Sequence, residues 1–360
     1  MALPRFPATS PFFHAPASRR TFLHSTLAVG TMGLLAGCGG TSAASSAAVK
    51  TAGGATVVRY QGSPNAVTYL ELAEDLGYLE GVQLQWLGNT TSGPQDIQSV
   101  ATGAADIGGA FAGAVVKLIE AGAAVTAVSN YYGSDAQTFQ GLFVAADSHI
   151  TTPRDLVGRS VAMNTLGAHA EAFVSTWLRR AGLSEEEIAE VTYVALPPND
   201  TGQAITRGFV DAGVLGGIAQ DVALAQGGIR ELVRDTDLFG GFAGGQVVLR
   251  DDWIEANPDA STSVATGIFR AVEWATDQPR ETVIARHTEI ITARGRDEKL
   301  EPLKHWKSSG LTDGGRIRDE DFTRWQDWLR TTRIVEEDLD PVKYYTNAFI
   351  TAAAVSGAVS

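Results

Sequence analysis

The segment Thr102–Gly109 (TGAADIGG) returns in outline at Thr206–Gly213 (TRGFVDAG), with a glycine three residues ahead of an aspartate in each copy. Both copies predict a helix that ends at the glycine, a short strand, and then a new helix. Because α/β units often converge on this spacing, the echo does not establish a duplication. It does predict two similar α/β lobes.

Two strand-to-helix units precede the first copy. The β-branched run Thr56–Tyr60 predicts a strand, and Ser63 with Pro64 then resembles the N-cap and first residue of a helix. A second strand is expected at Val82–Leu87, with Pro94 opening the next helix.

The rest of the chain divides by the same patterns. Strand Gly245–Arg250 is expected to return to the first lobe, and helices fill the chain from Asp251 on, where tryptophans are expected to pack. With 322 residues after position 38, two domains are the default. The predicted parts are lobe 1 at 55–147 and 243–360 and lobe 2 at 148–242.

The N-terminus predicts export. Arg19 and Arg20 precede an apolar run, Leu27–Leu35, which is the arrangement of a signal peptide and is too short for a membrane span. The run SRRTFL resembles a twin-arginine signal, and LAGC ending at Cys38 resembles a lipobox, in which the cysteine is lipidated. We therefore expect a lipoprotein signal at 1–38 and a small, polar, flexible tether at 39–54.

The net charge and the motifs of the sequence exclude several classes of protein function. The first 38 residues hold three arginines and no acid, so the remainder has 25 basic and 41 acidic residues, a net of −16, which repels nucleic acid and anionic lipid. Cys38 is the single cysteine, so no intramolecular disulfide can form. Searches for hydrolase, metalloprotease and phosphate-loop motifs find none, and the histidines lack metal-ligand spacing. No catalytic residue, metal or cofactor is expected.

Residues 164–182 (NTLGAHAEAFVSTWLRRAG) have helical apolar spacing, and the expected first turn contains no acid. A helix start of this kind, with Gly167 allowing close approach, is a candidate cradle for an anion or polar ligand. The alternative is that Thr165 caps the helix and the turn simply packs. The candidate residues here are Thr165, Leu166, Gly167 and His169, the histidine fitting a cleft rim or a cap better than a general base.

Other loops that follow strands are expected to face the same cleft, because ligands bind beyond the carboxyl ends of strands in open α/β sheets. None of these loops contains Lys or Arg, so an anion would be held by backbone N–H groups and hydroxyls. The candidate ligand-binding residues are Gln61, Ser63, Asn65, Ser92, Gly93, Gly109, Phe111, Asn130 and Gly217.

The order of these parts resembles the substrate-binding lipoproteins of ABC importers in the nitrate, sulfonate, taurine and thiamine-precursor group. The resemblance covers about residues 56–350 and is carried by LAEDLGYLEGVQLQW, TGAADIGGAF, TTPRDLVGRSVAMN, LRRAGL and ITRGFVDAGVL. It implies an α/β, two-lobed periplasmic-binding-protein fold of type II (venus-flytrap) with two crossovers, closing on one small ligand.

The same resemblance implies the protein's partners and place. These are a small polar or anionic ligand, permease subunits with their ATPase, and the membrane through a lipid anchor on the outer face of the cytoplasmic membrane or in the periplasm. We expect a monomer. The loop residues Thr165–Gly167 and Gly216–Ile218 depart from the family's pattern, so the resemblance does not identify the ligand.

The alternative function is that of an enzyme on the same fold, as in the pyrimidine synthase of thiamine biosynthesis, although that group is intracellular and has a cysteine at its site. A sensor or scavenger without a permease is a third reading.

Overall fold

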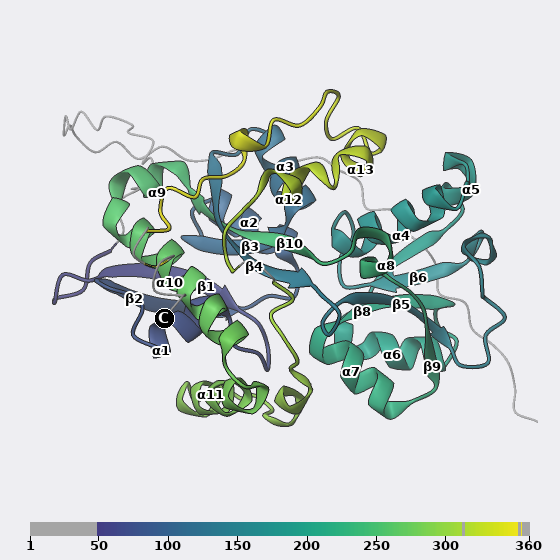
Figure 1. Cartoon of the computed structure of the whole chain (residues 1–360), viewed down its shortest axis with the longest axis horizontal. Coiled ribbons are helices and arrows are strands. Elements are labelled where there is room, and N and C mark those ends of the chain that lie inside the picture. Colours follow the sequence, from purple (N-terminus) through teal and green to yellow (C-terminus); the bar gives the residue numbers. More distant parts are fainter. Residues whose placement is uncertain (1–48, 312–313, 352–353, 355–360) are drawn as a thin grey trace, which may run out of the picture. The chain divides into compact units, whose positions relative to one another are not determined.

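The computed structural model describes residues 49–311, 314–351 and 354, and it contains two five-stranded sheets flanked by helices (Figure 1). The α/β class predicted from the sequence is confirmed. The predicted signal with Cys38, and residues 39–48 of the predicted tether, lie outside the described residues.

The first sheet has the strand order β2-β1-β3-β10-β4. β1 pairs in parallel with β2 and β3, whereas β10 runs antiparallel between β3 and β4. The return of β10 to this sheet confirms the predicted role of residues 245–250. The strands are β1 (Thr56–Gly62), β2 (Val82–Asn89), β3 (Ile107–Phe111), β4 (Val125–Ser134) and β10 (Phe242–Arg250).

The second sheet repeats this plan with the order β7-β6-β8-β5-β9. β6 pairs in parallel with β7 and β8, and β5 runs antiparallel between β8 and β9. The strands are β5 (Gln140–Ala145), β6 (Ser160–Met163), β7 (Thr192–Ala195), β8 (Ala212–Gly216) and β9 (Ile229–Arg234).

The chain crosses between the sheets twice, from β4 to β5 and from β9 through a short helix to β10. The predicted start of lobe 2 at residue 148 falls after β5, although β5 pairs in the second sheet. This strand therefore belongs with lobe 2, because its hydrogen-bonding partners are β8 and β9.

Thirteen α-helices connect and cover the strands in the described part of the chain, which also contains three short 3-10 helices (Figure 1). They are α1 (Tyr69–Asp75), α2 (Gly93–Ala101), α3 (Ala112–Glu120), α4 (His169–Arg180), α5 (Glu185–Ala189), α6 (Pro198–Thr206), α7 (Gly217–Gln226), α8 (Asp235–Phe239), α9 (Asp251–Ala256), α10 (Pro258–Asp277), α11 (Arg280–Ala293), α12 (Asp319–Thr323) and α13 (Gln326–Thr331). The predicted helical region after Asp251 ends with two short α-helices, α12 and α13. Trp325 lies between them and is buried, which agrees with a packing role.

The start of α1 differs from the prediction. The helix begins after Thr68, not at Pro64, because the Thr68 hydroxyl accepts the Glu71 N–H while the Glu71 carboxylate accepts the Thr68 N–H. This capping box satisfies two free N–H groups at once. Ser63 and Pro64 are left in the loop between β1 and α1.

The last residues of the predicted tether are also structured. Thr51 and Ala55 form a turn, in which the Thr51 hydroxyl accepts the Ala55 N–H at 3.1 Å. Lys50 forms a bridge with Thr56 at the start of β1. The fold therefore begins before residue 55.

The two echoed aspartates have the same structural role. In lobe 1, Asp106 accepts the backbone N–H of Arg59 at 2.9 Å and contacts its guanidinium at 2.6 Å. In lobe 2, Asp211 accepts the backbone N–H and the hydroxyl of Ser160, at 2.9 and 2.7 Å. Each carboxylate thus joins the start of β3 or β8 to the neighbouring parallel strand. The echo records a repeated strand clamp.

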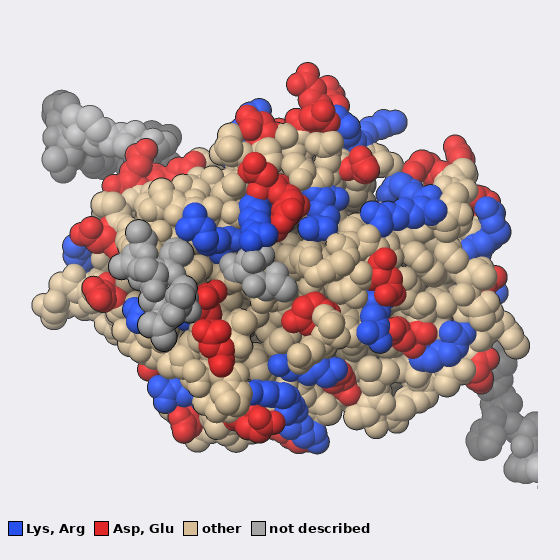
Figure 2. Space-filling view, viewed as in Figure 1, with Lys and Arg blue, Asp and Glu red and all other residues tan. Residues whose placement is uncertain are grey.

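Acidic and basic side chains are interspersed over the face shown in Figure 2. A mixed surface of this kind favours solubility. Among the described residues no helix has the length and apolar character needed to cross a membrane. That same part of the chain holds no group of three His, Cys, Asp or Glu residues placed to bind a metal ion.

The two clamps differ in burial, which predicts unequal stability effects. The Asp106 side chain is 3% exposed and that of Asp211 is 35% exposed. Asp106→Ala leaves Arg59 without its buried partner and should lower the free energy of unfolding by about 2 kcal/mol. Asp211→Ala is the matched control and should cost about 1 kcal/mol or less. Urea unfolding followed by tryptophan fluorescence measures both, and equal losses would contradict the burial argument.

Candidate functional site

A cavity of about 260 Å³ opens between the two sheets. Most of its lining comes from lobe 1, at the carboxyl ends of β1, β2 and β3 and the loops that follow them. Lobe 2 adds five residues: Gln140, Asn164, Thr165, Ala168 and His169. This is the position at which open α/β sheets hold their ligands.

Eight of the predicted ligand-binding residues line this cavity. They are Gln61, Ser63, Ser92, Gly93, Gly109, Phe111, Thr165 and His169. Five of the predicted residues do not line it: Asn65, Asn130, Leu166, Gly167 and Gly217.

Aromatic side chains form much of the cavity wall. Tyr60, Tyr69, Phe111, Tyr131 and Tyr132 all line it. A Cβ atom on Gly109 would lie 2.8 Å from the Tyr131 ring, so this glycine is required for the ring to pack against β3. Sequence analysis alone does not identify Tyr60 in β1 or Tyr69 in α1, because a tyrosine within a predicted strand or helix looks like an ordinary packing residue.

Asp96 is a buried carboxylate in the cavity wall that the sequence analysis missed. It lies in the first turn of α2, and its Oδ2 accepts the Gly109 N–H at 2.7 Å. Burial raises the pKa of Asp96 to about 7, although the Gly109 N–H opposes this shift. An acid at the start of a helix usually indicates dipole stabilisation, so nothing in the sequence marks it as a cavity residue.

Polar contacts cross the cleft beside the cavity. The hydroxyls of Ser92 and Thr165 are 3.2 Å apart, and Asn164 Nδ2 donates to the Thr91 carbonyl at 3.3 Å. The two lobes therefore meet through neutral hydrogen bonds at this edge.

The predicted anion cradle at the start of α4 is already occupied. The helix begins at His169, so the first turn does contain an acid, Glu171. Its carboxylate accepts the Gly167 N–H at 2.8 Å. Leu166 is 48% exposed, and Gly167 has a φ of 69°. The prediction of an acid-free helix start is wrong, because the helix begins three residues later than its pattern suggests.

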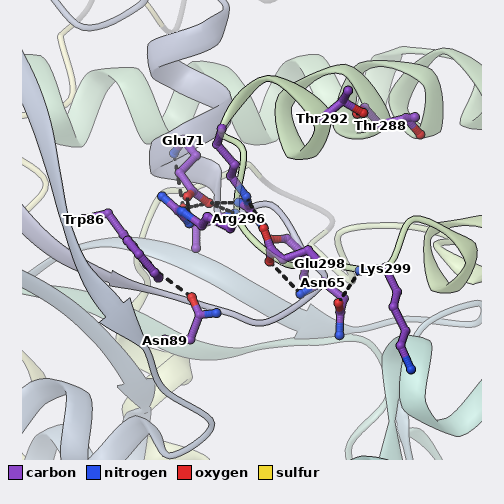
Figure 3. A network of polar contacts seen from close by, with 12 residues as sticks. Asn65, Glu71, Trp86, Asn89, Thr288, Thr292, Arg296, Glu298 and Lys299 are labelled. Carbon is purple, nitrogen blue, oxygen red and sulfur yellow. Dashed lines mark hydrogen bonds and ion pairs between the residues drawn. The ribbon is translucent and has the colours of Figure 1, made fainter.

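Asn65 turns away from the cavity. Its backbone N–H donates to Glu298 and its Oδ1 accepts the Lys299 N–H at 2.7 Å (Figure 3). It has a φ of 57°, a conformation that Asn tolerates better than most residues. Its partners come from a loop more than two hundred residues away in the sequence, which local patterns cannot reveal.

Asn130 and Gly217 also differ from the prediction. The Asn130 amide donates to the Arg316 carbonyl at 2.7 Å and to Asp321 at 2.9 Å, so it anchors the C-terminal segment to β4. Gly217 lines a neighbouring cavity of about 360 Å³. The two cavities share Tyr69, Tyr131, Tyr132, Gln140 and Asn164.

His169 lines the cavity, but its ring packs into an aromatic cluster. It stacks on Phe111 at 5.4 Å between ring centroids and meets Trp325 edge-on. Burial lowers the pKa of His169 to about 3, so the ring is neutral near pH 7. Its Nε2 is 3.4 Å from Asp235 Oδ2, but the two atoms do not form a hydrogen bond, and desolvation decides the protonation state.

An ion-pair network that includes Glu71 and Arg296 holds the hydroxyl of the cavity residue Tyr60 (Figure 3). The Tyr60 hydroxyl donates to Glu71 at 2.7 Å, and Arg296 contacts both of them at 2.9 and 3.0 Å. Arg296 also stacks over Trp86, 4.1 Å from the ring centroid. These contacts fix Tyr60 and occupy the guanidinium group.

Comparison with known proteins identifies the family. The family model described as "NMT1/THI5 like" matches residues 65–282, more than half of the chain. The nitrate import ATP-binding protein NrtC of Synechococcus elongatus is 27% identical over 105 residues, which are 29% of this chain and 16% of that protein. A protein of Escherichia coli (strain K12) described as an aliphatic sulfonates-binding protein is 31% identical over 147 residues, 41% of this chain and 44% of that one. The matches thus span less than half of either relative.

Solved structures share the fold. The periplasmic aliphatic sulphonate binding protein SsuA from Escherichia coli aligns with a TM-score of 0.61 and 22% identity over 81% of this chain and 92% of that one. The periplasmic nitrate-binding protein NrtA from Synechocystis PCC 6803 aligns with a TM-score of 0.66 and 12% identity over 84% and 89%. The desulfurization enzyme DSZB aligns with a TM-score of 0.56 and 16% identity over 84% and 99%.

These alignments confirm the predicted two-lobed periplasmic-binding-protein fold. The cavity lies between its lobes, where the strands of both sheets end. Together with the match over residues 65–282, this shows that the chain belongs to the NMT1/THI5-like family.

Proposed function

We propose that this protein is the extracytoplasmic solute-binding component of an ABC importer. It captures one small ligand between its lobes and delivers it to permease subunits that work with an ATPase. The observation that carries this proposal is a cavity lined by residues of both lobes, with Ser92 and Thr165 in contact across the cleft. The related nitrate and sulfonate proteins support the importer role.

The ligand is expected to contact the polar loop residues that converge on the cavity. Gln61, Ser63 and Ser92 come from lobe 1 and Thr165 from lobe 2, with Phe111 as an apolar contact. Gly93 and Gly109 shape the wall through close packing, since a Cβ on Gly93 would lie 2.9 Å from the Ala110 Cα and one on Gly109 would lie 2.8 Å from the Tyr131 ring. Capture by lobe closure is a shift between open and closed populations.

An enzyme on the same fold is the alternative, and DSZB shows that this fold also carries catalysis. Binding is favoured over the pyrimidine synthase reading because the described cavity lining contains no cysteine, the residue that this enzyme group has at its site. The chain's single cysteine, Cys38, belongs to the predicted signal.

The predicted export signal and the periplasmic relatives together support a location outside the cytoplasm. We further propose that Cys38 carries a lipid that holds the protein at the outer face of the membrane, that the twin-arginine route exports it, and that it acts as a monomer.

Ligand-dependent stabilisation tests the function. The full-length protein is screened by thermal shift against nitrate, alkanesulfonates, taurine, bicarbonate and hydroxymethylpyrimidine. A ligand at about 100 times its Kd should add about 2.7 kcal/mol to the free energy of unfolding. A saturable shift identifies a ligand, and conversion of that ligand into a new product would favour the enzyme alternative.

A paired substitution tests the location of the site. Thr165→Trp should fill the cavity and abolish the ligand-induced shift, because Thr165 lines it. Leu166→Trp is the matched control, because the neighbouring Leu166 is 48% exposed and does not line the cavity. Calorimetric binding curves should show loss in the first variant alone. Equal affinities in both variants would show that the ligand binds outside this cavity.

Lipidation is tested at Cys38. Cys38→Ser removes the thiol that would carry the lipid, so the protein should move from the membrane fraction to the soluble fraction. Ser10→Ala, an N-terminal substitution outside the lipobox, serves as the control and should remain with membranes. If the Cys38→Ser protein still sediments with membranes on ultracentrifugation, the lipobox interpretation is wrong.

A further inference from the structure

Three oxygen atoms at the cavity wall have no hydrogen-bond donor among the described residues. They are Oε1 of Gln61, Oδ1 of Asp96 and Oε1 of Gln140, and all three are shielded from solvent. Buried acceptors are rarely left unpaired, because the lost hydration has to be replaced. A ligand with N–H groups would supply such donors once these side chains turn their oxygens toward it.

Asp96 gives the strongest indication of the three. A glutamine amide can rotate to present its NH₂ group instead of its oxygen, but an ionised carboxylate can only accept. The side chain is buried, and Oδ2 is already paired with the Gly109 N–H at 2.7 Å. Oδ1 remains for a donor from outside the chain.

No cation balances this carboxylate in the described cavity lining, which contains neither Lys nor Arg. The guanidinium of Arg296 lies 3.3 Å from the position of a Cβ on Gly62, but it is not part of the lining and is paired with Glu71 and the Tyr60 hydroxyl. A bound oxyanion would therefore meet a carboxylate without a compensating charge, which is unfavourable in a buried site.

The remaining wall suits the apolar part of an organic cation. Phe111 and Tyr131 present aromatic rings, which attract cations, and Ile107, Val247 and Ile268 are aliphatic. The cavity has the volume of roughly nine water molecules at about 30 Å³ each. A single ring with one nitrogen-bearing substituent is of this size.

We propose that the cavity takes a small organic cation with N–H donors, an amine or amidine on an apolar body, and that Asp96, Gln61 and Gln140 accept its hydrogen bonds. The proposal rests on the solute-binding function above and narrows its ligand class. It sets this chain apart from relatives whose names refer to nitrate or sulfonates.

The pH dependence of the binding affinity distinguishes a cationic ligand from an oxyanion. Burial raises the pKa of Asp96 to about 7, so the ionised fraction grows about tenfold from pH 6 to pH 8. A cation needs the ionised form, and its affinity should rise with pH. An oxyanion needs the protonated form, and its affinity should fall as pH rises.

The other titratable groups that line the cavity with Asp96 do not change charge in this range. Asp235, which lies 3.4 Å from His169, is outside the lining; burial raises its pKa to about 6, so it gains negative charge between pH 6 and pH 8 and acts in the same direction as Asp96. Burial lowers the pKa of His169 to about 3 and raises the pKa values of the four cavity tyrosines above their ordinary value, so all of these are neutral. Among the elements packed on α2, β3 has no titratable residue. Lys117 and Glu120 on α3 are exposed, and Arg250 of β10 lies near Gly103 at the opposite end of α2.

The test compares two size-matched probe panels by calorimetry on the full-length protein. One panel holds single-ring amines and amidines with benzamidine as reference, and the other holds single-ring sulfonates with benzenesulfonate as reference, plus nitrate. We expect binding from the first panel, with affinity about tenfold higher at pH 8 than at pH 6. Asp96→Asn should weaken that binding at least tenfold.

Asp200→Asn is the matched control. Asp200 lies in the first turn of α6, as Asp96 lies in the first turn of α2, and both helices have a proline at their start. Unlike Asp96, Asp200 is exposed. This variant should bind as the unmodified protein does, and circular dichroism checks that both variants fold. An oxyanion that binds more tightly at pH 6 and in Asp96→Asn would overturn the ligand class and leave solute binding intact. Binding from neither panel would overturn the ligand class and count against solute binding as well.

Discussion

The position of β10 constrains the whole fold. This strand is hydrogen-bonded on both sides, to β3 and to β4, so the chain must return from the second sheet to the middle of the first. That return creates the second crossover and places both lobes around one cleft. Close to the crossovers, a Cβ on Gly133 would overlap the carbonyl oxygens of Phe242 and Gly310. Three backbone segments therefore meet there with no side chain between them.

The cavity wall depends on this frame through Gly109, which pairs with Val247 of β10. Its N–H holds Asp96 and its missing side chain makes room for Tyr131. One glycine thus positions both the carboxylate and the aromatic ring. The family fold sets where a ligand sits, whereas the few side chains placed on that frame set which ligand fits.

Local patterns predict the alternation of strands and helices, including a strand at residues 245–250, because periodicity and helix signals depend on neighbours in the sequence. They fail where a contact with a residue distant in the sequence determines the local structure. Ser63 with Pro64 and Thr68 with Glu71 are both valid helix starts, but Glu71 also binds Arg294 at 3.0 Å and Arg296 at 3.0 Å, so tertiary contacts favour the second.

The candidate site shows the same contrast between residues that local patterns predict and residues whose position depends on distant contacts. Eight residues in the carboxyl-terminal parts of strands, in the loops that follow them or at the helix starts beyond were predictable, because strand ends converge on a cleft in this class of fold. Asn65 and Asn130 have the same polar character as those residues, but they pair with Glu298 and with Asp321 on distant segments. Asp96 looks like an ordinary acid at a helix start, and its burial follows from the packing of α2 on β3.

The uneven lining of the cavity has a kinetic consequence. A ligand seated on lobe 1 already has most of its neighbours before Thr165 and the other lobe 2 residues reach it. Encounter is then governed by lobe 1, and residence time by how long lobe 2 stays in place. Because the contact between Ser92 and Thr165 is one hydroxyl–hydroxyl hydrogen bond, changes at that contact would adjust the release rate while leaving the association rate nearly constant.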